Sequence, residues 1–253
     1  MKKVLTIAGF DPSGGAGLQA DLKVFNSLGV YGLSVVTSLT AQNTQKVEKV
    51  LPVDPDFLRE QLFVLLSDIM PDAVKIGMIY SEKNIKTVES ITKKYSLKNI
   101  VLDPLILSSS GKRLLDEKAV AGIIKKLFPL CRVITPNISE ASALAGMEIR
   151  SEKDMEKAAI RLKEFGPENV IITGGHLERT AADIFYNGKF HYMTSKKIEG
   201  EFHGTGCVFS SAITAFLAKN EKPLESARLA KNFINKAIRK SFYLGKGMKL
   251  LDI

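Results

Sequence analysis

Short runs of β-branched and other apolar residues alternate with longer amphipathic stretches along almost the whole chain. This alternation is typical of parallel strands joined by helical crossovers. The expected strands cover residues 4–8, 33–37, 73–76, 100–103, 133–135 and 170–173. The expected helices cover residues 16–28, 55–67, 82–95, 117–127, 140–145, 152–165, 207–218 and 224–243. Several strands are continuous apolar runs, which predicts an α/β fold with a mostly parallel central sheet and helices on both faces.

The alternation changes after residue 173. Residues 183–186 and 190–194 flank Asn187-Gly188, which is a strong signal for a type I′ hairpin. We therefore expect a small antiparallel hairpin at one edge of the sheet. No linker, low-complexity tract or internal repeat interrupts the order, so residues 1–253 are predicted to form a single domain.

Composition is that of an ordinary globular protein, with 45% hydrophobic residues, 25% charged residues and a formal net charge of +9. The lysines are scattered over expected helix faces and Trp is absent, which argues against a nucleic-acid partner. The first apolar stretch ends at Asp11-Pro12, and no run approaches the ~18 apolar residues of a membrane span. Cys131 and Cys207 form no CxxC or Cys/His cluster, which fits a reducing compartment. We expect a cytoplasmic protein without a membrane partner.

A glycine-rich segment, GFDPSGGAG at residues 9–17, follows the first expected strand and leads into a helix. In an open α/β sheet, ligands bind beyond the carboxyl ends of the strands. Glycines let the backbone approach a ligand, and the helix start offers free N–H groups. A flexible turn is the alternative, but four glycines with Asp and Ser exceed what this connection needs. We interpret the segment as part of a binding site.

Residues 15–20, GAGLQA, formally match the GxGxxG/A pattern of dinucleotide-binding proteins. A dinucleotide site requires its glycines directly after the strand and an acidic residue at the end of the next strand. Here the glycines come late and the second strand ends in TSLT. A nicotinamide-dependent dehydrogenase is therefore disfavoured.

A second glycine segment, HGTGC at residues 203–207, leads directly into an apolar helix. Consecutive N–H groups in such a turn form a nest for the negative charge on a transferring phosphoryl group. The helix dipole favours a thiolate at Cys207, which we expect to be exposed and to act as a general base or nucleophile. Its alternative is a small apolar residue that starts the helix. His203 and His176 both flank glycine turns, where either loop packing or phosphate contact is possible.

Polar residues also follow two other strands. Asp103 ends one, and Asn137 and Glu140 lie three residues apart after the next. A carboxylate and an amide in this arrangement could hold Mg²⁺ through its waters. Asn137 and Glu140 equally match a capping box, which needs no function. The residues alone leave both interpretations open.

Together, these segments resemble the hydroxymethylpyrimidine/phosphomethylpyrimidine kinases of the ribokinase-like superfamily. The matching segments, in chain order, are TIAGFDPSGGAGLQADLKVFNSLGVYG, TSLTAQNT, KIGM, VLDP, ITPNISEA, GGHL, HGTGC and GKG. The resemblance implies a ribokinase-like three-layer sandwich and a homodimer. It also implies phosphorylation of 4-amino-5-hydroxymethyl-2-methylpyrimidine by ATP with Mg²⁺, followed by phosphorylation of the monophosphate, in thiamine biosynthesis. Pyridoxal kinase is the nearest alternative, and Gln42 within AQNT favours the pyrimidine.

The resemblance implies four groups of site residues. The pyrimidine pocket would be formed by Gly9, Asp21, Gln42 and Met78. The nucleotide would contact Asn137, Thr173, Gly175 and His176, and Mg²⁺ would bind at Asp103 and Glu140. Catalysis would use Cys207 as general base and an anion hole of Gly204, Thr205 and Gly206.

One position departs from the family pattern. Members usually carry KGGH, with a lysine facing the nucleotide phosphates, whereas this chain has Thr173 at the lysine position. Threonine cannot supply a positive charge. A neighbouring cation, Lys196 or Lys197, could take over that role.

Overall fold

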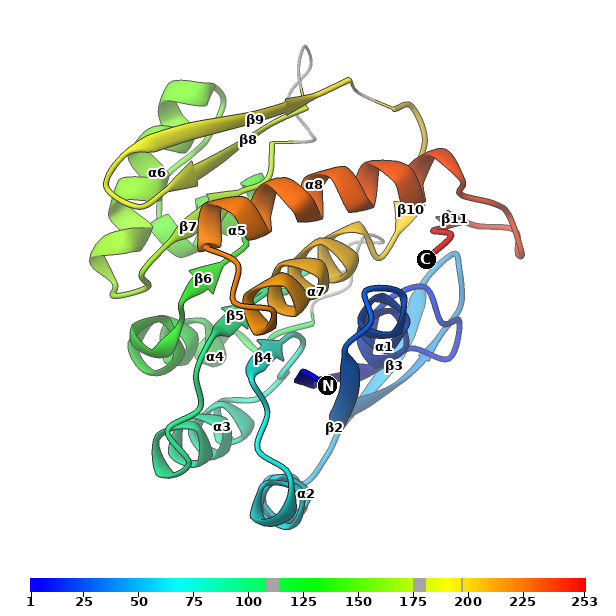
Figure 1. Ribbon diagram of the computed structural model, residues 1–253, viewed down its shortest axis with the longest axis vertical. Coiled ribbons are helices and arrows are strands. Elements are labelled where there is room, and N and C mark those ends of the chain that lie inside the picture. The colour runs from blue at the N-terminus through cyan, green and yellow to red at the C-terminus, as the bar shows by residue number, and fades with distance from the viewer. Residues whose placement is uncertain (108–113, 175–180, 197) are drawn as a thin grey trace.

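The computed structural model describes residues 1–107, 114–174, 181–196 and 198–253 (Figure 1). One nine-stranded sheet runs through the molecule in the order β3-β2-β1-β4-β5-β6-β7-β8-β9. Its central part is parallel, and consists of β2 (Tyr31–Gln42), β1 (Lys3–Phe10), β4 (Ala73–Ile76), β5 (Ile100–Leu102), β6 (Val133–Ile134) and β7 (Val170–Ile172). Consecutive residues of β7 face opposite sides, because Val170 and Ile172 belong to one buried cluster and Ile171 to another. This two-sided burial is why the central strands are continuous apolar runs.

Helices cover both faces of the sheet (Figure 1). One core packs the sheet against α2 (Pro55–Asp68), α3 (Glu82–Lys94), α4 (Glu117–Gly122), α5 (Ile138–Ala145) and α6 (Glu152–Glu164). A second core packs the other face against α1 (Gly17–Ser27), α7 (Thr205–Ala218) and α8 (Pro223–Arg239). The predicted three-layer α/β sandwich is confirmed.

Both edges of the sheet are antiparallel. The predicted hairpin forms one edge, where β8 (Ala181–Tyr186) and β9 (Phe190–Ser195) are joined by the three residues Asn187-Gly188-Lys189. The expected type I′ turn is wrong, because such a turn has two residues with positive φ, and here only Gly188 has a positive φ. The other edge, β3 (Val47–Pro52), was not predicted, and β2 continues to Gln42 instead of ending at Thr37. Four of the six residues of β3 are solvent-exposed and Glu48 and Lys49 interrupt its apolar residues, so its sequence lacks the continuous apolar run of the central strands.

The chain also differs from the prediction at its C-terminal end. The helix expected to reach Tyr243 ends at Arg239. The following segment turns back, and β11 (Lys249–Leu250) pairs in parallel with β10 (Phe202–His203). Two-residue strands carry no periodicity, so the sequence could not reveal this pair. The helix expected over residues 117–127 is α-helical only to Gly122, and a π-helical turn over Ile123–Leu127 follows.

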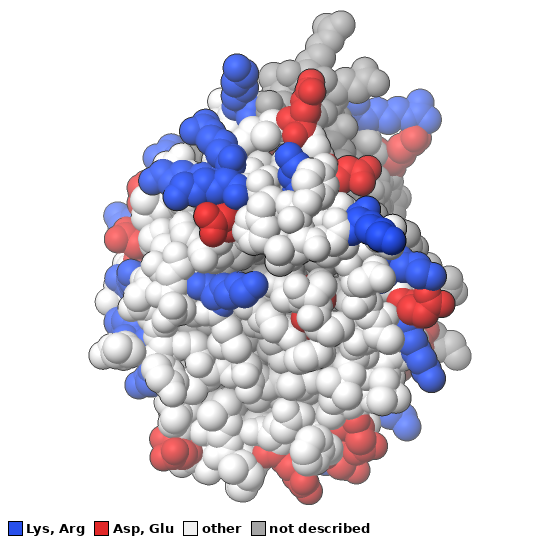
Figure 2. Space-filling model, turned by 90° about the vertical axis from the view of Figure 1, so that its right-hand side faces the viewer, with Lys and Arg blue, Asp and Glu red and all other residues white. Residues whose placement is uncertain are grey.

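Charged residues are scattered over the outside of the molecule. On α3, for example, Lys86 pairs with Glu82 and Lys93 with Glu89. Figure 2 looks onto the side that carries β3 and shows basic and acidic residues mixed around a largely uncharged centre. The positive net charge is therefore not gathered into one stripe on this face. Among the described residues, no helix is long and apolar enough to cross a membrane.

Candidate active site

The two glycine turns of the sequence meet at the carboxyl ends of the strands. Gly204 has a left-handed backbone with φ of 80°, and a Cβ atom there would lie 1.9 Å from the carbonyl oxygen of Gly15. A Cβ atom on Gly15 would in turn lie 2.4 Å from Cδ2 of His203. The starts of α1 and α7 are therefore packed backbone against backbone (Figure 1). Only glycine permits this approach.

Asp11 joins the two turns. Its Oδ1 accepts hydrogen bonds from the backbone N–H and the hydroxyl of Ser13, its Oδ2 accepts from the N–H of Ala16, and Nε2 of His203 lies 2.9 Å from Oδ2. Burial raises the pKa of Asp11, but the hydrogen bonds from His203 and Ser13 outweigh it and lower the pKa to about 2. The contact between Nε2 and Asp11 thus fixes the ring of His203 against the first glycine turn. The buried Nδ1 of the same ring has no hydrogen-bond partner among the described residues.

Cys207 is buried, with only 4% of its surface exposed, so the expected exposed thiol is wrong. The expected thiolate is also not favoured in this structure. Burial, with a smaller effect of the charges of Asp103 and Asp21, outweighs the lowering by Lys75 and raises the pKa of Cys207 to about 12. A helix dipole contributes only about 0.3–1 kcal/mol, which is less than the cost of burying a thiolate.

Asp21, which was expected in the pyrimidine pocket, lies on α1. It is fully buried, and Nζ of Lys75 lies 3.1 Å from its Oδ1 and 2.9 Å from its Oδ2. The hydroxyls of Ser211 and Thr6 donate to Oδ1 and Oδ2, each at 2.6 Å. Both carboxylate oxygens therefore accept protein hydrogen bonds, and a contact of Asp21 with the substrate stays a prediction.

Lys75 is a functional candidate that the sequence analysis missed. Its side chain is fully buried; burial alone would lower its pKa, but the charge of Asp21 raises it well above its usual value. The charge of Lys75 also acts on Cys207 and Asp103. The available signal was a lysine within the otherwise apolar strand AVKI.

Asn137 and Glu140 form the capping box at the start of α5. The Glu140 N–H donates to Oδ1 of Asn137, and the Asn137 N–H donates to Oε2 of Glu140, both at 3.0 Å. Oε1 of Glu140 is buried and has no partner within the described part of the chain. The capping role therefore uses only one of the two carboxylate oxygens.

Asp103 and Glu140 are two buried carboxyl groups near each other. Burial and the charge of Asp103 raise the pKa of Glu140 to about 8, against a lowering by backbone hydrogen bonds from Asn137 and Ile106. Burial outweighs the lowering by Lys75 and the Ser210 hydroxyl and raises the pKa of Asp103 to about 6. Within the described ranges, no group of three or more His, Cys, Asp or Glu residues could hold a metal. Two carboxylates with one unpartnered oxygen fit Mg²⁺, which usually takes its other ligands from water and phosphate.

Three of the residues expected at the pyrimidine lie along the same edge. A Cβ atom on Gly9 would lie 2.9 Å from Oγ of Ser38 and 3.1 Å from Sδ of Met78, so these residues pack closely. Gln42 ends β2 and is partly exposed. Its Nε2 lies 3.5 Å from Nε2 of His203. The end of β2 thus meets the strand that leads into the HGTGC turn.

On the nucleotide side, Asn137 and Thr173 form an isolated parallel bridge at the ends of β6 and β7. The next residue, Gly174, donates its N–H to Oδ1 of Asp183, whose Oδ2 lies 2.6 Å from Nζ of Lys231. Through Asp183, Lys231 of α8 is therefore connected to the turn after β7. The Lys196 side chain, which was expected to supply a cation there, is exposed. Gly175, His176 and Lys197 lie outside the described residues.

A model of the phosphomethylpyrimidine kinase family matches residues 11–252, which include the HGTGC segment and all but the first two residues of the GFDPSGGAG segment. The chain belongs to this family. It is 41% identical to the hydroxymethylpyrimidine/phosphomethylpyrimidine kinase of Aquifex aeolicus over 251 residues, which cover 98% of each chain.

Solved structures of two related kinases share the fold. An ADP complex of Bacillus subtilis pyridoxal kinase has a TM-score of 0.93 and 38% identity, covering 100% of this chain and 97% of that one. A phosphomethylpyrimidine kinase from Clostridium difficile has a TM-score of 0.84 and 40% identity, covering 94% of this chain and 100% of that one. The predicted family and its ribokinase-like fold are confirmed, and the chain is a phosphotransferase of the phosphomethylpyrimidine kinase family.

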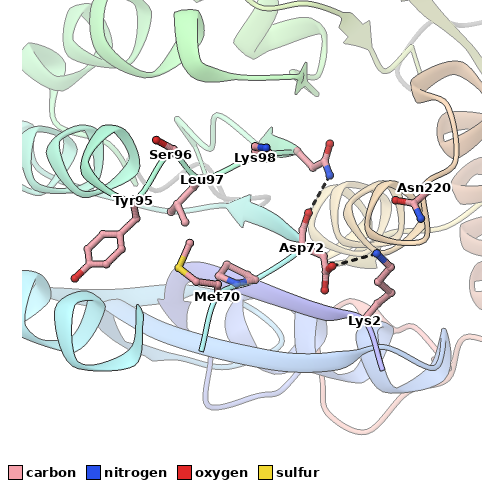
Figure 3. A pocket seen from close by; sticks show the side chains of 10 residues that line it. Lys2, Met70, Asp72, Tyr95, Ser96, Leu97, Lys98 and Asn220 are labelled. Carbon is pink, nitrogen blue, oxygen red and sulfur yellow. Dashed lines mark hydrogen bonds and ion pairs between the residues drawn. The ribbon is translucent and has the colours of Figure 1, made fainter. Parts of the chain in front are cut away.

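A separate cavity of about 420 Å³ lies at the opposite, amino ends of the strands (Figure 3). The Lys2 Nζ lies 3.1 Å from Oδ1 of Asp72, and the Lys3 N–H donates to Oδ2 of Asp72 at 2.8 Å. Asn99 donates to the backbone oxygen of Asp72. The polar groups that Figure 3 shows at Asp72 are thus engaged with one another, and the cavity is remote from the kinase site.

Proposed function

We propose that the chain phosphorylates 4-amino-5-hydroxymethyl-2-methylpyrimidine with ATP and then phosphorylates the resulting monophosphate to the diphosphate. Family membership supports this reaction. The observation that carries it is the meeting of Gln42 with the HGTGC turn, whose His203 lies 3.5 Å away. An amide that can hydrogen-bond to an aminopyrimidine edge is thereby placed beside a nest for the transferring phosphoryl group.

In the first step, the alcohol oxygen forms a bond to the γ-phosphorus of ATP, and the bond from that phosphorus to ADP breaks. We propose that Cys207 accepts the alcohol proton and that Gly204, Thr205 and Gly206 surround the transferring group. Gly9 leaves room for the pyrimidine ring and Met78 packs against it. In the second step, the nucleophile is already a phosphate oxyanion, so no base is needed.

We propose that Asp103 and Glu140 hold Mg²⁺, supported by the unpartnered Oε1 of Glu140. When bound, this ion would neutralise charge on the phosphate oxygens. Asp103 lies beside the anion hole, because a Cβ atom on Gly206 would be 3.6 Å from its Oδ2. The two carboxylates therefore set where the phosphates of the nucleotide can lie relative to the alcohol.

For the nucleotide, we propose contacts with Asn137, Thr173, Gly175 and His176. The Thr173→Lys variant tests whether the absent lysine matters. A lower Michaelis constant for ATP would support a missing contact. An unchanged constant would indicate that another cation, such as Lys231 behind Asp183, already serves this turn.

Pyridoxal kinase activity is the second candidate, because the Bacillus subtilis pyridoxal kinase matches this fold with a TM-score of 0.93. A coupled assay of ADP release with ATP and Mg²⁺ separates the two. We expect turnover with the pyrimidine alcohol and with its monophosphate. Turnover with pyridoxal alone would overturn the proposal.

We further propose a homodimer in the cytoplasm. Leu39 and Leu51 pair across β2 and β3 at an edge of the sheet and are both roughly half exposed. A second copy would cover this apolar face. The Leu51→Lys variant should sediment as a monomer where the unmodified protein sediments as a dimer, and equal sedimentation would contradict this interface.

Both cysteines are free, which fits the reducing compartment proposed for this protein.

A further inference from the structure

The late GKG segment has no role in the chemistry described above, yet it forms close contacts. It belongs to residues 245–250, which we call the C-terminal strap. The strap packs on Thr44, two residues beyond Gln42. Oγ1 of Thr44 accepts a hydrogen bond from the Gly247 N–H at 3.2 Å, and the Thr44 carbonyl accepts one from the Met248 N–H at 3.0 Å.

Both glycines of the strap lie where a larger residue would collide with Thr44. A Cβ atom on Gly245 would lie 2.5 Å from Oγ1 of Thr44, and one on Gly247 would lie 2.1 Å from the Thr44 carbonyl oxygen. Neither distance is possible for a real side chain without movement of the backbone or of Thr44. Thr44 itself lies in the turn between β2 and β3 and is only 9% exposed.

The other end of the strap reaches the anion hole. Lys249 and Leu250 pair in parallel with Phe202 and His203, directly before the Gly204–Gly206 turn. The Leu250 side chain also packs on Gly15, where a Cβ atom would lie 2.7 Å from Leu250 Cδ2. One short segment therefore contacts both the turn after Gln42 and the strand that leads into the phosphoryl-transfer turn.

We propose that the C-terminal strap is a positioning element, which fixes the distance between Gln42 and the anion hole and thereby between the alcohol and the transferring phosphoryl group. This inference rests on the proposed function. A displacement of about 1 Å at a reacting centre can cost about 100-fold in rate. Asn137 and Thr173 form a β-bridge at the ends of β6 and β7, where the Thr173 N–H donates to the Pro136 carbonyl, so nucleotide binding should not depend on the strap.

Two variants test the strap. Gly247→Ala inserts a Cβ against the Thr44 carbonyl, and Thr44→Val removes the hydroxyl that accepts from Gly247. We expect kcat/KM for the pyrimidine alcohol to fall about 10- to 100-fold in each, with the KM for ATP changed less than about twofold. Thr44→Ser keeps the hydroxyl and should restore most of the activity. Gly122→Ala is the matched control, because its Cβ would meet only ordinary contacts at 3.6 Å.

Thermal unfolding of each variant separates positioning from a general loss of folding. The proposal is overturned if kcat/KM for the alcohol stays at the unmodified value, or if the KM for ATP rises in parallel. It is also overturned if Thr44→Ser is as impaired as Thr44→Val. Should the unmodified enzyme phosphorylate pyridoxal and not the pyrimidine, the proposed function fails, and the same comparison with pyridoxal still decides the role of the strap.

Discussion

Cys207 lies at the start of α7, where a dipole would favour its thiolate, yet it is surrounded by protein. Burial is the larger effect and raises its pKa to about 12. The charge of Lys75 opposes this rise. At neutral pH the group is therefore a thiol before substrate binds, and its role as a base depends on the small fraction that is ionised.

Removal of this thiol should affect the two phosphorylations differently. Cys207→Ala is expected to reduce the rate with the pyrimidine alcohol by about 100-fold or more, which is typical for the loss of a general base. The rate with the monophosphate should change far less, because its nucleophile is already ionised. Separate initial rates with each substrate provide the measurement. Cys131→Ala is the matched control, since Cys131 is a buried cysteine in a different core.

The pH dependence of the two phosphorylation rates tests whether Cys207 acts as the base. Because the raised pKa leaves Cys207 protonated at neutral pH, the thiolate fraction should rise about tenfold per pH unit up to that pKa. The rate of the first phosphorylation should therefore rise between pH 7 and 9 relative to that of the second. A constant ratio of the two rates over this range would contradict a base at Cys207.

Glu140 should couple stability to both pH and magnesium. Its pKa is raised from 4.5 to about 8, so the protonated form is favoured on folding, and stability falls as pH rises from 4.5 through 8. Glu140→Gln removes the titrating group and therefore this pH-dependent loss of stability. It keeps a side-chain oxygen that can accept the hydrogen bond from the Asn137 N–H. At pH 8.5 without metal, we expect the variant to melt at or above the temperature of the unmodified protein, with a smaller rise on adding Mg²⁺. An equal rise in both proteins would exclude Glu140 as a ligand.

At the scale of elements, one buried ion pair joins four segments. Asp21 of α1 meets Lys75 of β4, Thr6 of β1 and Ser211 of α7. The starts of α1 and α7 carry the two glycine turns, so this network holds the turns relative to the sheet. Its members come from distant parts of the sequence, and no local pattern could predict their meeting.

Loss of Lys75 should destabilise the protein strongly. Lys75→Met leaves the Asp21 carboxylate buried without its counter-charge, which typically costs about 3–5 kcal/mol in the free energy of unfolding. The double variant Asp21→Asn with Lys75→Met removes both charges and should recover much of that loss. Denaturant unfolding of the two variants measures the difference. A double variant as unstable as the single one would show that the network matters through its shape rather than its charges.

The central elements were predictable because burial on both faces imposes a clear pattern. β4 matches its prediction at both ends, and α3 differs by one residue. β3, β10 and β11 were missed since they are exposed or only two residues long. In the site, glycine turns could be recognised from composition, whereas the burial of Cys207 and the engagement of Asp21 depend on tertiary packing.

At the scale of the whole molecule, the continuous sheet is what assembles the site. The carboxyl ends of β1, β2, β5 and β6 bring Asp11, Gln42, Asp103 and Asn137 to one edge, and α7 adds the HGTGC turn from near the other end of the chain. Because every one of these groups depends on the same sheet, we propose that residues 1–253 act as a single domain. The related kinases that share this framework include both pyridoxal and phosphomethylpyrimidine kinases. We propose that the choice of substrate depends on a few side chains such as Gln42.

The most direct test of the account follows the products formed from a single alcohol. The unmodified protein, ATP and Mg²⁺ are incubated with 4-amino-5-hydroxymethyl-2-methylpyrimidine, and phosphorus NMR spectra are recorded over time. We predict that a monophosphate forms first and is then converted to a diphosphate. A reaction that yields no phosphorylated pyrimidine, in a protein that phosphorylates pyridoxal under the same conditions, would contradict the central claim.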